Sequence, residues 1–207
     1  MRSVPNAITL VRLLLVPFFV VLLIDSGDFS RYLAVAIFIF AALTDFLDGV
    51  IARRLGAVTD FGKLLDPLAD KLLVMAALVM LAGMKLDQYG LPCRPGDACI
   101  LGASWVPAWM VVLILGREFW VTGVRAVAAE GGFVLAAGSG GKIKSAMQMT
   151  AIPMILIHDV ELSIPFSPAT TSCYTVGLYL LFFSVVVSYW SAVEYSFAAL
   201  GARKRPS

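Results

Sequence analysis

Four aspartates, Asp45, Asp48, Asp66 and Asp70, lie inside or beside strongly apolar stretches of the sequence. The first two are spaced i, i+3 and the last two i, i+4, so on helices each pair would share one face. Four carboxylates in one low-dielectric pocket would repel each other strongly unless cations lay between them. Oxygen ligands favour hard ions such as Mg²⁺ or Mn²⁺. Two such ions, about 3.5–4 Å apart, are a common way to activate a phosphoryl group for in-line displacement.

The aspartates belong to a longer pattern, D-x2-D-G-x2-A-R-x8-G-x3-D-x3-D, which resembles the signature of the CDP-alcohol phosphotransferases. Every fixed position is matched, by Asp45, Asp48, Gly49, Ala52, Arg53, Gly62, Asp66 and Asp70. The resemblance implies two divalent ions, Mg²⁺ or Mn²⁺, held by the four aspartates. It also implies that Asp70 is the general base for an acceptor hydroxyl. The alternative is structural, with buried carboxylates that pair with neighbouring arginines or lysines.

The small residues of the pattern, Gly49, Ala52 and Gly62, would leave room for a nucleotide to approach the backbone. The resemblance assigns them to binding of the cytidine diphosphate, although close helix packing also favours Gly and Ala. Arg53 is suited to bidentate binding of phosphate oxygens. Its alternative is an arginine whose charged end reaches the membrane surface.

A basic set, Arg117, Arg125, Lys142 and Lys144, lies within or at the ends of later apolar segments, where ionisable residues are functional candidates. A phosphorylated acceptor would need such a set. The alternative is anchoring at the membrane surface together with an Arg125–Glu118 pair. Three further segments resemble those of bacterial family members that make phosphatidylglycerophosphate, namely VPNAITLVRLLLVPFF, GREFWVTGVRAVAAEGG and GKIKSAMQMTAI.

The resemblance therefore implies transfer of a phosphatidyl group from CDP-diacylglycerol to sn-glycerol 3-phosphate, with release of CMP. It also implies a homodimer. Inositol phosphate, serine or another phosphatidyl group remain alternative acceptors. A cation transporter that uses the aspartates as its ion site is the alternative from another class, but it would favour broken helices and repeats, which the sequence does not show clearly.

The composition explains how such residues would be positioned. Of the 207 residues, 60% are hydrophobic, and the mean hydropathy is +0.89. We therefore expect one all-α integral membrane domain over residues 1–207, with six transmembrane helices. The net charge of +2 does not suggest nucleic-acid binding.

The expected spans run roughly over 8–24, 32–54, 66–84, 105–127, 142–157 and 173–200. Placing both termini in the cytoplasm puts thirteen of the sixteen Lys and Arg residues on the inner side, as the positive-inside rule requires. At 1.5 Å per residue, both aspartate pairs then reach the cytoplasmic half of the bilayer, so the active site would face the cytoplasm.

The connections are predicted as loops. Residues 55–65 form a short polar connection, and Pro67 falls in the first turn of the third span. Residues 86–104, 130–141 and 158–171 are longer loops, the last containing His158. The sequence does not decide whether Cys93 and Cys99 form a disulfide in the outer loop. Thr9 and Arg12 either line the mouth of the site or are ordinary interface residues.

Overall fold

The computed structural model describes residues 4–25, 27–55, 60–87, 99–130, 139–163 and 170–203, and for several stretches, 45–55 and 60–70 among them, it describes the backbone alone. Six helices make up most of this part of the chain, so the prediction of a mostly helical protein is confirmed. They are α1 (Val4–Ile24), α2 (Asp28–Leu55), α3 (Asp60–Gly83), α4 (Ala108–Glu130), α5 (Ser139–Leu156) and α6 (Cys173–Arg203).

Local signals in the sequence explain where several helices begin. Asp28 begins α2, where its negative charge complements the helix dipole. Pro107 directly precedes α4, and its carbonyl accepts a hydrogen bond from the Met110 amide at 2.9 Å. Ser172 caps α6, because its Oγ accepts a hydrogen bond from the Thr175 amide at 3.2 Å.

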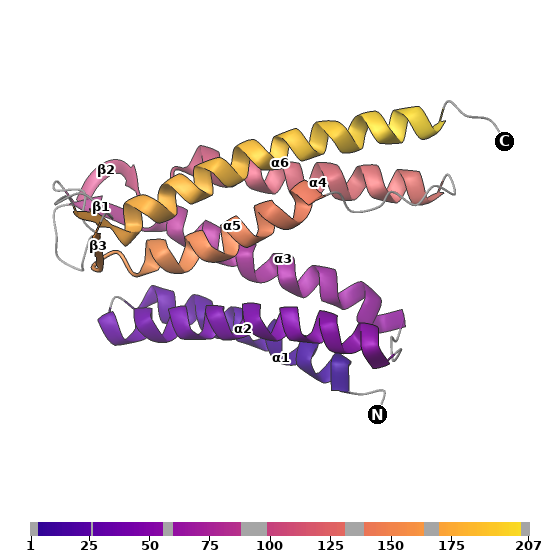
Figure 1. Ribbon diagram of the computed structural model, residues 1–207. Coiled ribbons are helices and arrows are strands. Elements are labelled where there is room, and N and C mark those ends of the chain that lie inside the picture. The colour runs from indigo at the N-terminus through magenta and orange to yellow at the C-terminus, as the bar shows by residue number, and fades with distance from the viewer. Residues whose placement is uncertain are drawn as a thin grey trace.

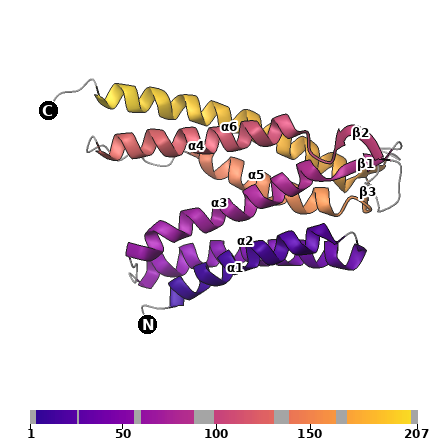
Figure 2. The same ribbon diagram turned by 180° about the vertical axis from the view of Figure 1, so that it is seen from behind.

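The helices form an elongated bundle with two recognisable ends. In Figure 1, α1 and α2 lie along one side, α4 and α6 along the other, and α3 and α5 between them. The first turn of α1 and the last turn of α6 lie at one end, which we call the terminal end. The strands lie at the opposite end, which we call the strand end, and Figure 2 shows the same arrangement from behind. Helices therefore alternate in direction between the two ends.

Two short strand pairs close the strand end. Strand β1 (Lys85–Asp87) pairs antiparallel with β2 (Cys99–Ser104), and β3 (Glu161–Ser163) pairs with β4 (Thr170–Ser172). The sequence predicted only loops here. Residue Trp105 connects the first pair to the bundle, because its Nε1 donates to the Lys85 carbonyl and its own carbonyl accepts from the Tyr174 hydroxyl.

The buried core is apolar, and it is closest packed where α5 meets α6. Phe19 of α1 packs against Phe38 of α2, with ring centroids 5.8 Å apart. On α6, Gly177 lies so close to α5 that a Cβ there would meet the Ala151 carbonyl oxygen at 2.9 Å. Other fully buried large side chains include Leu78, Leu81, Val106, Ile152, Ile155, Leu156 and Leu181.

One described helical segment, Cys173–Phe197, is long and apolar enough to cross a membrane by length and composition, with a mean hydropathy of 1.9. Val11–Ile24 and Lys71–Gly83 are shorter apolar helices. The prediction of six spans with cytoplasmic termini is finer than this finding and stays a prediction.

Four predicted helix starts differ from the structure by three or four residues and that of the third helix differs by six, while the sixth agrees. The third helix begins at Asp60, so the connection before it is limited to residues 56–59, and Pro67 lies beyond the first turn. Phe61, Leu64 and Leu65 continue the helical spacing of the apolar stretch, which outweighs the polar residues between them. The fifth helix begins at Ser139 rather than after the glycine-rich link. Cys93 and residues 131–138 lie outside the described residues, so the Cys93–Cys99 disulfide stays open.

Candidate active site

The backbone brings both halves of the aspartate pattern to the terminal end of the bundle. The C-terminal half of α2 carries Asp45, Asp48, Gly49, Ala52 and Arg53, and the N-terminal half of α3 carries Gly62, Asp66 and Asp70. Helix α2 ends where α3 begins (Figure 1). The side chains of these eight residues lie outside the described part of the structure, so their roles in binding metal and nucleotide stay predictions.

The predicted basic set lies on α4 and α5. Arg117 lies near the middle of α4 and Arg125 near its end, while Lys142 and Lys144 lie in the first turns of α5. In Figure 1, α4 runs to the terminal end and α5 begins about midway along the bundle, so the set lies along the same half of the bundle as the aspartate pattern.

A contact between α3 and α4 connects the two groups. The Lys71 ammonium donates a hydrogen bond to Thr122 Oγ1 at 3.0 Å. Lys71 directly follows Asp70, and Thr122 lies on α4 between Glu118 and Arg125. The helix that carries the second aspartate pair is therefore in side-chain contact with the helix that carries two of the basic residues.

Two of the four basic residues converge on one carboxylate. Glu118 Oε1 accepts a hydrogen bond from Arg117 Nη1 at 3.0 Å and forms an ion pair with the Lys144 ammonium. Arg117 is held from the other side, because its Nε donates to the Ser188 carbonyl of α6 at 2.9 Å. All three charged side chains are largely buried, so this is a cationic cluster inside the bundle rather than at its surface.

The other two basic residues have different surroundings. Arg125 donates from Nη2 to the Tyr195 hydroxyl of α6 at 2.9 Å, and its guanidinium carbon lies 4.9 Å from the centroid of that ring. Lys142 is exposed. The alternative Arg125–Glu118 pair is thus wrong, since Arg125 is bound by Tyr195 and Glu118 by Arg117 and Lys144.

Sequence reasoning missed Tyr195 and Ser188 as partners of this set. Both lie on α6, about 70 residues from the arginines they contact, and no local pattern in an apolar helix marks them. The sequence did not decide whether Arg12 lines the mouth of the site or is an ordinary interface residue. In the structure Arg12 is buried within the bundle, at 3% exposure, which disfavours the second interpretation. Among the described residues, no group of three or more His, Cys, Asp or Glu side chains is placed to hold a metal.

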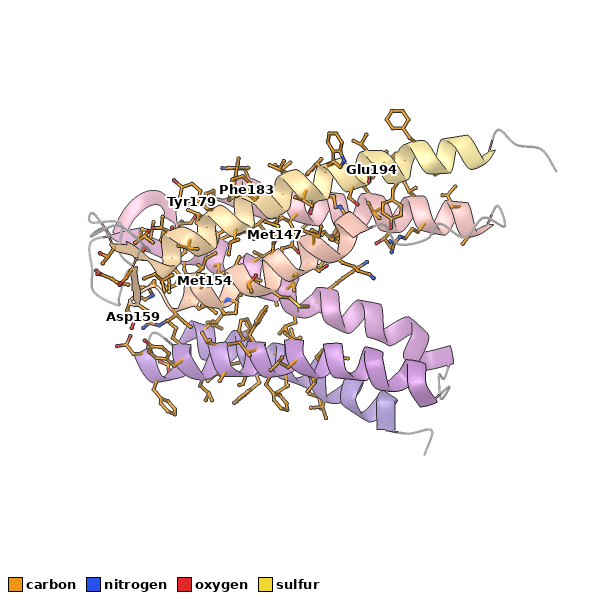
Figure 3. All side chains as sticks on the ribbon, viewed as in Figure 1. Met147, Met154, Asp159, Tyr179, Phe183 and Glu194 are labelled. Carbon is orange, nitrogen blue, oxygen red and sulfur yellow. The ribbon has the colours of Figure 1, made fainter. Side chains whose placement is uncertain are left out.

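A second polar network lies at the strand end, away from this site. Arg31 at the start of α2 forms ion pairs with Asp28 and Asp159 and lies 3.1 Å from the ring nitrogens of His158. The Tyr32 hydroxyl donates to Asp159 at 2.5 Å. Figure 3 labels Asp159 at this end and Glu194 toward the other end of α6.

The charges of this network shift its pKa values. Burial and the neighbouring Arg31 charge lower the pKa of His158 below its ordinary value of 6.5. Burial alone would raise the pKa of Asp159, but the hydrogen bond from Tyr32 and the charge of Arg31 outweigh it, and the pKa of Asp159 is lowered. The network connects α2 to the turn after α5 by charged contacts.

The chain is similar to known proteins over nearly its whole length. Residues 2–193 match the model of the family described as CDP-alcohol phosphatidyltransferase. A Bacillus subtilis (strain 168) protein named CDP-diacylglycerol–glycerol-3-phosphate 3-phosphatidyltransferase is 39% identical, over 97% of this chain and 98% of its own length. A Pseudomonas fluorescens protein of the same name is 34% identical, over 95% and 90%. A rice (Oryza sativa subsp. japonica) protein named cardiolipin synthase (CMP-forming) is 34% identical, over 93% of this chain and 56% of its own length.

Proposed function

The chain belongs to the CDP-alcohol phosphatidyltransferase family, and on that basis we propose that it transfers the phosphatidyl group of CDP-diacylglycerol to sn-glycerol 3-phosphate. The products are phosphatidylglycerophosphate and CMP, and the reaction belongs to phospholipid biosynthesis. The name shared by the Bacillus and Pseudomonas relatives supports glycerol 3-phosphate as the acceptor.

One structural observation supports a phosphorylated acceptor in particular. The cationic cluster of Arg117 and Lys144 is buried on α4 and α5, and α4 contacts α3 through the residue after Asp70. Buried cations attract an anion more strongly than surface cations do, because water screens them less. Serine or another acceptor without a phosphate would have no need of this cluster.

We propose the following reaction at this site. The acceptor hydroxyl oxygen attacks the phosphorus that carries the diacylglycerol, the bond from that phosphorus to the oxygen of CMP breaks, and CMP leaves with the electron pair. Asp70 takes the proton of the hydroxyl. Arg53 binds the donor phosphates, Gly49, Ala52 and Gly62 leave room for the nucleotide, and Arg117, Arg125, Lys142 and Lys144 bind the phosphate of the acceptor.

The aspartates suit divalent metal ions, because they offer only oxygen ligands and the backbone brings both pairs to one end of α2 and α3. We propose that Asp45, Asp48, Asp66 and Asp70 hold two Mg²⁺ or Mn²⁺ ions. When bound, these ions neutralise the charge that develops on the pyrophosphate.

We further propose that all six helices span the inner (cell) membrane, with both termini and the site on the cytoplasmic side, and that the enzyme is a homodimer. Exposed apolar stripes support the spanning helices. On α1 the stripe is Val11, Leu14, Phe18 and Val21, and on α6 it is Tyr179, Phe183, Val186, Trp190, Val193 and Phe197. Each stripe follows helical spacing on an outward face, as contact with lipid requires. The dimer follows from the family resemblance alone.

A single assay tests the function. Purified protein receives CDP-diacylglycerol and one acceptor from a panel of glycerol 3-phosphate, inositol phosphate, serine and phosphatidylglycerol, and CMP release is followed with and without Mg²⁺ or Mn²⁺. We expect CMP release with glycerol 3-phosphate only, and only with metal. Transfer only to phosphatidylglycerol would instead give the activity named for the rice relative. Metal-driven ion flux without any transfer would favour the transporter.

A further inference from the structure

Glu118 lies between two cations that come from different helices. Its Oε1 accepts from Arg117 Nη1 on α4 and pairs with the Lys144 ammonium on α5. The side chains of Glu118, Arg117 and Lys144 are 13%, 4% and 8% exposed. One carboxylate oxygen therefore fixes the separation of two charges that the sequence alone leaves on independent segments.

The cluster is rigidly held on its α6 side. Arg117 Nε donates to the Ser188 carbonyl, and a backbone carbonyl inside a helix is a fixed point. A guanidinium has five N–H donors, and the described contacts of Arg117 use two of them. The arginine can therefore bind Glu118 and a second anion at the same time.

The negative charge of Glu118 offsets the free-energy cost of burying both cations. Two adjacent cations without a counterion would repel each other and lose their hydration, and removing one partner of a buried charge group is strongly destabilising. With Glu118 present, the three groups carry a net charge of +1. That residual charge, together with further donors, suits a phosphomonoester.

We infer that Glu118 is a positioning residue for the acceptor phosphate, which it serves by holding Arg117 and Lys144 in one geometry. This inference rests on the proposed function. Glu118 does not touch the reacting atoms, and it acts on binding of the acceptor alone. The donor is bound by the aspartate pattern on α2 and α3 and does not depend on it.

The test is a comparison of Glu118→Gln with Glu118→Asp in the full-length enzyme, with KM for glycerol 3-phosphate, KM for CDP-diacylglycerol and kcat measured separately. The Gln variant keeps an acceptor oxygen but loses the charge, so we expect its acceptor KM to rise about 10-fold or more, as for the loss of a charge-assisted hydrogen bond. Its donor KM should stay unchanged. The Asp variant keeps the charge at a shorter reach, and it should recover part of the loss.

Glu194→Gln is the matched control. Glu194 lies on α6, is exposed and accepts a hydrogen bond from Trp190 Nε1 at 3.0 Å, so the same substitution there should leave all three constants unchanged. Should Glu118→Gln fail to fold, the Asp variant carries the test, because a retracted carboxylate must still raise the acceptor KM.

The outcomes separate this inference from the function on which it rests. An unchanged acceptor KM with lowered thermal stability would make Glu118 a purely structural ion-pair partner. A lowered acceptor KM would make it a competitor of the phosphate. Either result overturns the inference while the proposed function stands. If the wild-type enzyme does not use glycerol 3-phosphate at all, the proposed function fails, whatever the variants do.

Discussion

At the scale of single residues, proton transfer depends on Asp70. We expect Asp70→Asn to lower kcat by about 100-fold or more, because general-base catalysis contributes about 10²–10⁴-fold. Binding of CDP-diacylglycerol should be largely retained, since Arg53 and the other three aspartates remain. The measurements are CMP release under saturating substrates and donor binding at equilibrium. Near-normal turnover would remove Asp70 from the mechanism.

Asp60→Asn is the matched control for Asp70→Asn. Asp60 begins the same helix, α3, but occupies one of the variable positions of the pattern, between Arg53 and Gly62. We expect its variant to keep wild-type turnover. An equal loss in both variants would mean that the charge of α3 as a whole, and not the carboxylate of Asp70, supports the reaction.

Arg125 allows a second prediction at this scale. We expect Arg125→Ala to raise the KM for glycerol 3-phosphate by about 10-fold or more with little change in donor KM, because a hydrogen bond to a charged group contributes about 1.5–3 kcal/mol. Tyr195→Phe removes the hydroxyl that accepts from Arg125 but keeps the ring beneath it, so its effect should be smaller. A fall in thermal stability alone would leave Arg125 a packing residue.

The sequence singles out the residues of the proposed site, but not the partners that the structure gives to some of them. A fixed spacing identifies Asp45 to Asp70, because spacing along a helix determines which side chains share a face. Glu118 was noticed only as a possible partner of Arg125. The actual partners of both residues depend on how α5 and α6 pack against α4, and such long-range contacts leave no local pattern.

At the scale of helices, Gly177 controls how closely α6 approaches α5. We expect Gly177→Ala to lower the apparent melting temperature, since a Cβ there would meet the backbone of Ala151 and Ile155 at about 3 Å. Overpacking costs about 1–3 kcal/mol, which exceeds the gain of about 1 kcal/mol for Ala over Gly in a helix. Thermal unfolding of the detergent-solubilised protein measures this. Gly123→Ala is the control, because a Cβ there meets nothing within 4 Å and the variant should be at least as stable.

The protonation of His158 should make the stability of the contact between α2 and the turn after α5 depend on pH. Because its pKa is lowered in the folded protein, the unfolded chain binds the proton more readily, so stability is fully present above pH 6.5 and falls as the pH drops below it. Protonation would also place two positive charges, on His158 and Arg31, side by side. We expect melting temperatures to fall between pH 7.5 and 5.5.

His158→Gln should make that fall smaller. The chain has one histidine, so a change of slope in this range reports on His158. Asp159, whose pKa is lowered, titrates in the same direction, but its contribution is lost only below its ordinary value of 3.8. An identical pH slope in the variant and the wild type would show that the neutral form of His158 does not stabilise the fold.

The helices show why some elements could be predicted and others could not. Long apolar stretches predicted all six helices, because a buried or lipid-facing helix needs them. The start of α3 was placed too late, since residues 55–65 suggested a polar connection and Pro67 was expected in the first turn. The strand pairs were missed because each has only three to six residues and is held by pairing rather than by an alternating pattern.

At the scale of the whole molecule, the helices alternate in direction (Figure 1). In the proposed membrane the strand end and the terminal end would therefore lie on opposite sides. Single cysteines test this in a variant whose three native cysteines are replaced. Glu161 in β3 and Lys142 at the start of α5 are both exposed, and the length of α5 separates them. We expect a thiol reagent that cannot cross membranes to label Glu161→Cys in intact cells and Lys142→Cys only after permeabilisation. Labelling of both from the same side would contradict a bundle that spans the bilayer, and the reverse pattern would place the site outside the cytoplasm.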